Sequence, residues 1–238
     1  MGSSIEEEED ERDTSVAAVV KLGGAAITQK DKFETLDEVT LKACAVAISE
    51  AVRRLEEERP VESEEGGDGT RPRPRRPHQG IVVVHGAGSF GHFQARRRGV
   101  AKGVPVHRRR DGQGDVMRVL GDDPELLQGI AETRLSVTKL NHLVVSALLA
   151  EGVPAVGMSP FGGWVTRGSA VDDAARRRSA AAVRGVRAAV AAGLVPVLHG
   201  DVVMDGLQGC AVLSGDTVTQ ELAAALRPER AVFLTNVM

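Results

Sequence analysis

Aromatic side chains are scarce in this chain of 238 residues, which contains five Phe, one Trp and no Tyr. A hydrophobic interior must therefore be built from Ala, Val, Leu and Ile. Such aliphatic side chains suit helices packed on a mostly parallel sheet, because the strands of that sheet are buried on both faces. The scarcity of aromatics thus favours an α/β fold, and the length allows one full core, with at most a small extra lobe.

The chain also has few cysteines, a small net charge and no long apolar run. Cys44 and Cys210 match no metal-ligand spacing, which favours buried thiols in a reducing compartment and no metal site. No apolar run reaches about 18 residues, so we expect no membrane span. The acidic opening at 6–10 lacks the basic and apolar regions of a signal peptide. A net charge of −3 predicts no general attraction to nucleic acid. Together these absences predict a soluble cytoplasmic protein.

Strand and helix signals alternate along the chain. Thr35-Leu-Asp-Glu38 has the spacing of a capping box, which predicts Thr35 as a helix cap. Asp123-Pro124 is typical of a second helix start, and Asp205-Gly206 of the tight turn of a hairpin. We expect strands at 17–22, 81–85, 154–158, 194–198 and 231–235, helices at about 35–55, 124–152, 172–192 and 214–226, and a hairpin at 202–213. This order predicts a mostly parallel open sheet sandwiched by helices, with a small β-hairpin element.

Polar stretches mark the domain organisation. We expect a disordered acidic N-terminus at 1–15 and a single α/β domain at 16–238. Residues from about 57 to 79 are rich in Glu, Arg, Pro and Gly, which predicts a disordered surface insertion. Residues 96–122 form a second polar stretch with weak periodicity. Its arginine runs lack interleaved aromatics, so solvated surface is favoured over a nucleic-acid site.

A glycine-rich turn follows the strand expected at 81–85. Gly86, Gly88 and Gly91 allow the backbone to approach a ligand closely and to point N–H groups at phosphate oxygens. His92 then adds a side-chain donor of the type that changes charge near neutral pH. The turn also matches G-x-G-x-x-G, but it does not open the first βα unit and no acidic ribose contact follows about twenty residues later. The segment therefore predicts an anion site rather than a dinucleotide fingerprint.

Four expected strands end in residues suited to ligand binding. These ends are Lys21-Leu-Gly-Gly24, His85-Gly-Ala-Gly88, His199-Gly-Asp201 and Thr235-Asn236. Ligands of parallel sheets bind beyond the carboxyl ends of the strands, so all four should share one rim. Glycines after strands often only form turns, but three of these ends also carry Lys or His.

Together these motifs resemble a known family. Lys21-Leu-Gly-Gly24, Lys30, the loop at 85–92, His199-Gly-Asp201 and Ser214-Gly-Asp216 are similar to the amino acid kinase superfamily, and most to isopentenyl phosphate kinases. His92 is the discriminating residue, because that family binds the substrate phosphate with a histidine there. Segments 133–142 and 153–160 also look like the plant-type members. The resemblance implies transfer of phosphate from ATP, with Mg²⁺, to isopentenyl phosphate.

The resemblance also implies residue roles. Lys21 would bridge the transferring phosphate, Lys30 would support the ATP phosphates, and His92 would grip the acceptor phosphate. The implied ATP site comprises Lys21, Gly23, Gly24, Gly88 and Asn236. The implied substrate site comprises Gly86, Ala87, Gly91, His92 and Gly200.

Other interpretations remain open for each of these residues. Lys21 and Lys30 also fit solvated lysines, and His92 fits an inert loop residue. His85 and His199 also fit side chains that only hydrogen-bond the backbone. Asp201 and Asp216 fit residues that cap or orient loops.

The C-terminal end departs from the family pattern. Family members continue after Thr235-Asn236 with further strands, helices and another phosphate-binding lysine, so we expect the C-terminal nucleotide-binding portion to be missing. The alternative functions are a truncated, non-catalytic phosphate-binding or interaction protein, and a kinase acting on another small phosphate or carboxylate. Homodimers are common in the resembled family, so a homodimer is a further expectation.

Overall fold

The computed structural model describes residues 15–58, 79–103, 107–110, 116–119 and 123–235. Almost all of the acidic N-terminus and of the insertion expected at 57–79 lies outside these residues. Asn236, which the family resemblance assigns to the ATP site, lies outside them too.

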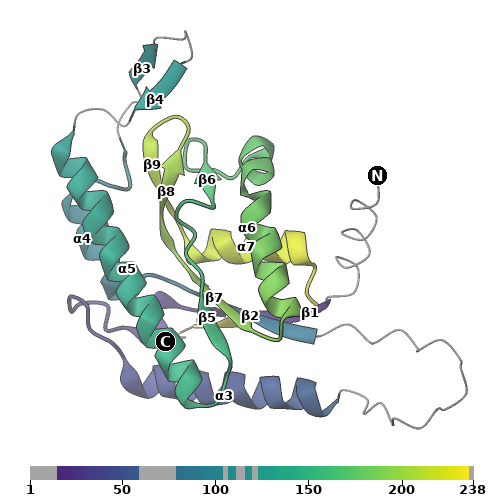
Figure 1. The fold of residues 1–238 in the computed structure, drawn as a ribbon. Helices are drawn as coiled ribbons and strands as arrows, with labels where there is room; N and C mark the ends of the chain where they lie inside the picture. Colours follow the sequence, from purple (N-terminus) through teal and green to yellow (C-terminus); the bar gives the residue numbers. More distant parts are fainter. Residues whose placement is uncertain (1–14, 59–78, 104–106, 111–115, 120–122, 236–238) are drawn as a thin grey trace, which may run out of the picture.

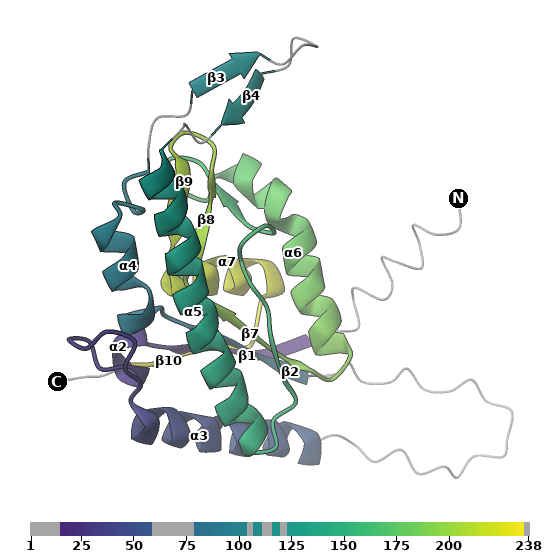
Figure 2. The same ribbon diagram turned by 60° about the vertical axis from the view of Figure 1, so that its left-hand side comes forward.

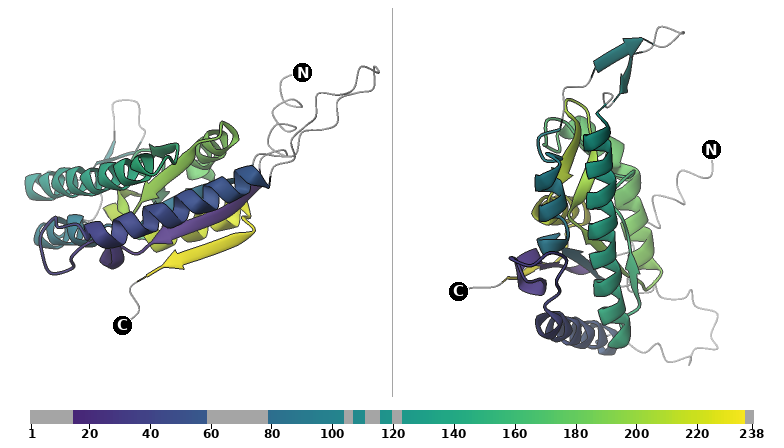
Figure 3. Two further views of the ribbon diagram at one scale, coloured as in Figure 1. Left: turned by 90° about the horizontal axis from the view of Figure 1, so that it is seen from below. Right: turned by 90° about the vertical axis from the view of Figure 1, so that its left-hand side faces the viewer.

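A five-stranded sheet forms the centre of the molecule, in the order β10-β1-β2-β7-β5 (Figure 1). Its strands are β1 (Ser15–Leu22), β2 (Gln79–His85), β5 (Ala155–Gly157), β7 (Val195–His199) and β10 (Arg230–Leu234). Every pair of neighbours in this sheet is parallel. The prediction of a mostly parallel open sheet is therefore confirmed. Seen from below, β10 lies at one edge of the sheet (Figure 3).

Helices cover both faces of the sheet (Figures 1 and 2). One layer contains α3 (Glu38–Glu57) and α5 (Pro124–Ala150), and the other contains α6 (Asp173–Ala191) and α7 (Gly215–Leu226). Strand β2 contributes side chains to the cores on both faces of the sheet, because successive side chains of a strand point to opposite faces. Ile81 and Val83 pack with the α3–α5 side, whereas Val82 and Val84 pack with the α6–α7 side. The aliphatic run of β2 is thus explained by burial on both faces.

The expected starts of α5, α6 and α7 agree with the structure to within one residue, whereas that of α3 does not. Asp123 caps α5, as predicted, and Ser214 caps the helix that was expected to begin at 214. The cap of α3 is Asp37, whose carboxylate accepts a hydrogen bond from Thr40 N at 3.0 Å. The prediction of Thr35 as that cap was wrong, because Thr35 N instead donates to Ser89 Oγ, 54 residues away. The expected apolar stripe of α3 is confirmed, with Leu41, Ala45 and Ile48 buried.

A second small sheet lies beside the main one and contains β6 (Val165–Thr166), β8 (Asp201–Asp205) and β9 (Gly209–Leu213). Strands β8 and β9 are antiparallel, which confirms the predicted hairpin. No sequence pattern predicted β6, which is only two residues long.

Further short elements follow β1 and β2 or lie in the polar stretch at 96–122. These are α2 (Gly24–Ile27), η1 (Gly88–Phe90), α4 (His92–Arg97), β3 (His107–Arg110) and β4 (Val116–Val119). Within the part of the chain that the structure describes, strands β3 and β4 pair only with each other. Helix α4 matters most for the site, because it begins directly after the glycine-rich turn.

Candidate active site

The carboxyl ends of four strands meet at one edge of the main sheet. Leu22 lies opposite both His85 and Leu234 in register, and His85 lies opposite His199. The segments that follow these strands therefore begin side by side, at the edge where parallel sheets bind ligands. The expected common rim is confirmed for the described residues.

Backbone approaches backbone closely at this rim, and only glycine fits there. A Cβ atom on Gly24 would lie 2.4 Å from Gly88 N. Gly88 itself has φ +49°, in the left-handed region that favours glycine. A Cβ atom on Gly86 would likewise lie 2.7 Å from Gly24 N. The glycines after β1 and β2 are thus required by the contact between the two loops.

A cavity of about 630 Å³ opens at this rim. Most of the residues expected at the site line it: Lys21, Gly24, Gly86, Ala87, Gly88, Gly91, His92 and Gly200. Gly23 is not among the lining residues; it is buried, and its N–H donates to Leu234 O at 2.8 Å. Lys30 is exposed in the loop between α2 and α3 and does not line the cavity either.

Other lining residues were not assigned from the sequence. Arg96 and Lys102 come from α4 and the turn after it, and Thr133 and Val137 come from one face of α5. In the sequence, only helical spacing could have indicated these residues, because residues four apart share one face of a helix. Arg96 follows His92 by four residues, and Val137 follows Thr133 by four. An apolar portion of the wall comprises Ala95, Ala101, Val137, Val202 and Val212.

Lys21 is directed into the site by an ion pair. Its ammonium group lies 2.7 Å from the carboxylate of Asp216, in the first turn of α7. The Lys21 side chain is only 12% exposed, whereas that of Asp216 is 70% exposed. A freely solvated lysine at the end of β1 is therefore not what the structure contains.

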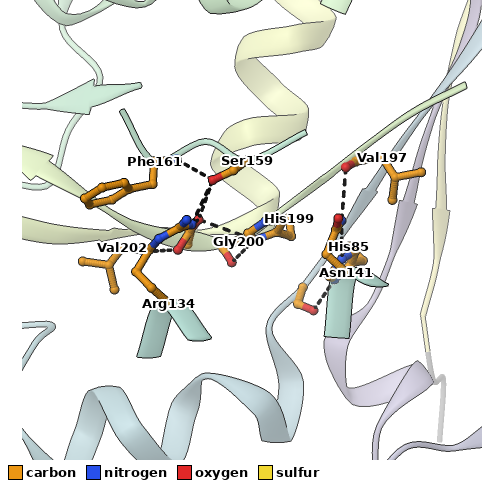
Figure 4. Close-up of polar contacts among 11 residues, drawn as sticks. His85, Arg134, Asn141, Ser159, Phe161, Val197, His199, Gly200 and Val202 are labelled. Carbon is orange, nitrogen blue, oxygen red and sulfur yellow. Dashed lines mark hydrogen bonds and ion pairs between the residues drawn. The ribbon is translucent and has the colours of Figure 1, made fainter. Parts of the chain in front are cut away.

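Two buried histidines lie behind the glycine loops (Figure 4). Their rings stack with centroids 5.5 Å apart. His85 Nδ1 donates to Gly86 O at 3.0 Å, His199 Nδ1 donates to Gly200 O at 3.1 Å, and Asn141 Nδ2 lies 3.1 Å from His85 Nε2. This arrangement leaves His85 Nε2 as the acceptor for the Asn141 amide. Because the peptide bond is planar and trans, the N–H of Ala87 points in the opposite direction to the Gly86 carbonyl that His85 holds.

Burial keeps both histidines neutral. Burial, together with the neighbouring His199, lowers the pKa of His85 to about 3. Burial likewise lowers the pKa of His199 to about 4. Neither ring is suited to proton transfer at pH 7, and both hold the backbone of the cavity wall in place.

Asp201 forms a second buried polar group beside the cavity. It is ion-paired with Arg134, whose guanidinium also donates to Ser159 Oγ at 2.9 Å and lies over the Phe161 ring. Burial raises the pKa of Asp201 to about 6, although the Arg134 charge acts in the opposite direction. Its carboxylate accepts from Val202 N at 2.8 Å, so Asp201 fixes the start of β8.

Comparison with known proteins identifies the family. The sequence model of the amino acid kinase family matches residues 17–238. The chain belongs to the amino acid kinase family. It is 38% identical to the isopentenyl phosphate kinase of Arabidopsis thaliana over 96% of this chain and 66% of that protein. It is 32% identical to the isopentenyl phosphate kinase of Methanothermobacter thermautotrophicus over 92% of this chain and 66% of that protein.

The fold agrees with this membership. A solved structure described as isopentenyl phosphate kinase superposes with a TM-score of 0.65 at 29% identity, covering 92% of this chain and 72% of that one. This amino acid kinase family chain spans 66% of the length of the two relatives named above. Within the described residues, no helix combines the length and apolarity that crossing a membrane requires.

Proposed function

We propose that this protein transfers the terminal phosphate of ATP to isopentenyl phosphate, giving isopentenyl diphosphate and ADP. The observation that carries the proposal is that Lys21 and His92 line one cavity together with the glycine loops after β1 and β2. The similarity to isopentenyl phosphate kinases supplies the substrate.

The chemistry asks mainly for charge neutralisation. A phosphate monoester has its second pKa near about 6, so the attacking oxygen is ionised at pH 7 without a strong base. Two unit charges about 4 Å apart repel by about 4 kcal/mol at an effective dielectric of about 20. In the proposal, Lys21 neutralises the transferring phosphate and His92 holds the acceptor phosphate. Backbone N–H groups of the glycine loops complete the cradle.

Other parts of the cavity have matching roles. The apolar wall of Ala95, Ala101, Val137, Val202 and Val212 suits a short branched hydrocarbon tail. Lys30 stays a predicted contact of the ATP phosphates. The cytoplasm and a homodimer stay our predictions for location and assembly.

Mg²⁺ is proposed as the cofactor that accompanies ATP. The residues that the structure describes contain no group of three or more His, Cys, Asp or Glu side chains that could hold a metal ion. Mg²⁺ does not need such a group, because it is commonly bound through one or two carboxylates, waters and the substrate phosphates. Asp216, exposed at the cavity, is the carboxylate best placed to meet it. The ion would neutralise phosphate charge.

The test is turnover with labelled ATP, Mg²⁺ and isopentenyl phosphate. We expect diphosphate formation by the wild type and a loss of about a hundredfold or more in both Lys21→Ala and His92→Ala. Lys42→Ala and His142→Ala are matched controls, because both residues are exposed and neither lines the cavity. These controls should keep turnover within about twofold of the wild type.

Other outcomes select the alternative functions. Binding of isopentenyl phosphate without turnover would identify a non-catalytic phosphate-binding protein. Turnover of a carboxylate in its place would identify a different kinase of the same family. If Lys21→Ala and His92→Ala both kept the turnover of the wild type, the reaction would take place elsewhere in the molecule.

A further inference from the structure

The charges that line the cavity are unevenly paired. Lys21 is bound to Asp216, and Asp201 is bound to Arg134, so both lining carboxylates already have a cationic partner. His92, Arg96 and Lys102 also line the cavity, and among the described residues none of the three has an ion-pair partner. The side of the cavity formed by α4 and the turn after it thus carries uncompensated positive potential. Such a wall attracts anions.

Arg96 lies where it can act together with His92. The two residues are four apart on α4, so they share one helix face with Cβ atoms about 5–6 Å apart. Both are exposed, and both line the cavity. The next residue, Arg97, is also exposed but does not line the cavity. The helix therefore presents one arginine of this run to the cavity and directs its neighbour elsewhere.

The orientation of α4 is fixed by its other face. Gln94 is buried, and its amide donates to Ser136 Oγ on α5 at 2.7 Å and to Glu34 at 3.2 Å. Ala95 is buried as well. The third arginine of the run, Arg98, pairs with Glu132 at 3.3 Å and Glu125 at 3.7 Å on α5. Arg98 is thus committed to holding the helix, whereas Arg96 keeps its guanidinium available.

We propose that Arg96 is a second side-chain ligand of the acceptor phosphate, acting with His92, and that it makes the cavity select a phosphate monoester over a carboxylate with the same tail. This inference rests on the proposed function and names a residue that the function does not require. A guanidinium offers a planar pair of N–H donors that matches two phosphate oxygens. A carboxylate carries one charge less at pH 7 and gains less from the second cation. Lys102 adds charge to the same wall.

The first test compares four proteins: wild type, Arg96→Gln, Arg96→Lys and Arg97→Gln. Isothermal titration calorimetry measures the Kd for isopentenyl phosphate, and steady-state kinetics measures KM for both substrates. A charge-assisted hydrogen bond lost in Arg96→Gln should raise Kd and the acceptor KM about tenfold or more, with the ATP KM unchanged. Arg96→Lys should recover part of the affinity, and Arg97→Gln should remain within about twofold of the wild type.

The second test measures selectivity by binding alone. The probes are isopentenyl phosphate and 4-methylpent-4-enoate, a carboxylate with the same branched alkene. We expect the ratio of their affinities to fall about tenfold in Arg96→Gln and to stay unchanged in Arg97→Gln. A His92→Ala/Arg96→Gln double variant should lose less than the product of the two single losses, because both side chains contact one phosphate. Melting temperatures verify that each variant is folded.

The outcomes separate this inference from the proposed function. Wild type that neither binds nor phosphorylates isopentenyl phosphate would overturn the proposed function itself. A wild type active on isopentenyl phosphate, with Arg96→Gln indistinguishable from Arg97→Gln, would overturn the role of Arg96 alone. An Arg96→Gln effect confined to the ATP KM would also overturn it, because the residue would then serve the other substrate.

Discussion

At the scale of single residues, the buried histidines determine the shape of the cavity wall and do not take part in the chemistry. His85 and His199 each hold the carbonyl of the glycine that follows them, at 3.0 and 3.1 Å. The sequence placed both histidines at strand ends beside glycine, and backbone hydrogen bonding was one of the interpretations left open. Asn141 was out of reach of sequence reasoning, because it meets His85 across 56 residues of chain.

The buried histidines predict how stability depends on pH. The unfolded chain protonates His85 near its ordinary pKa of 6.5, whereas the folded chain does so only near about 3. Between these values the unfolded state binds more protons, so the free energy of unfolding falls as pH falls from about 6.5. His199 acts in the same direction, and Asp201, with a pKa raised to about 6, partly offsets them below pH 6.

The measurement is urea denaturation at pH 7, 5 and 4, followed by the fluorescence of the single, buried Trp164. We expect His85→Asn to lose stability less steeply on acidification, with a difference of about 2 kcal/mol or more between pH 7 and pH 4. Its amide can still donate to Gly86 O but does not titrate. Exposed His142→Asn should keep the wild-type slope, and an equal slope in His85→Asn would contradict the assignment.

At the scale of helices and strands, the sequence predicted those features that depend on a pattern within one continuous segment. The apolar stripe of α3, the Asp123-Pro124 start of α5 and the β8–β9 hairpin were all predicted. The cap of α3 failed because Thr35 is engaged by Ser89, a contact that no local pattern encodes. Helix α4 went unpredicted because it is six residues long and rich in polar side chains.

The turn between β8 and β9 depends on one carboxylate. Asp205 accepts hydrogen bonds from Ser169 N and Leu207 N at 2.8 Å, from Gly168 N and Gln208 N at 3.0 Å, and from Thr166 Oγ1 at 2.7 Å. Although burial alone raises the pKa of Asp205, these donors hold it at about 2. The group joins β6 and the hairpin into one small sheet.

We therefore expect Asp205→Ala to lower the free energy of unfolding by about 3 kcal/mol or more, since buried donors lose a charged acceptor. Thermal and urea unfolding measure the loss. Glu50→Ala, which breaks an exposed ion pair with Arg54 on α3, is the control and should change stability by less than about 0.5 kcal/mol. A loss as small as that of the control would mean that the turn holds without its carboxylate.

At the scale of the molecule, the site exists because segments far apart in sequence end at one edge of a sheet. Parallel strands alone allowed that convergence to be predicted from the strand-end residues. The sequence could not say which helix walls close the cavity, because side chains such as Arg96 and Val137 reach it only through the packing of α4 on α5.

Substituting a glycine at the contact between two loops tests this convergence. Gly24→Ala would place its methyl carbon 2.4 Å from Gly88 N, so the loops after β1 and β2 must separate. We expect kcat/KM to fall about tenfold or more and stability to fall by about 1–3 kcal/mol. Gly185→Ala on α6 is the control, because its new methyl would meet only Met158 Cε at 3.6 Å. Unchanged kcat/KM in Gly24→Ala would show that the loops tolerate separation.

The two-sided burial of β2 has a consequence for protein engineering. Because Ile81 and Val83 face one helix layer and Val82 and Val84 the other, hydrophobicity alone does not distinguish the strand from the same strand shifted by one residue. The contact between His85 and Asn141 determines which residues of β2 face each helix layer. Grafting residues 81–92 onto another parallel sheet would therefore transplant the loop without its orientation, unless the recipient scaffold also supplied an amide opposite the histidine.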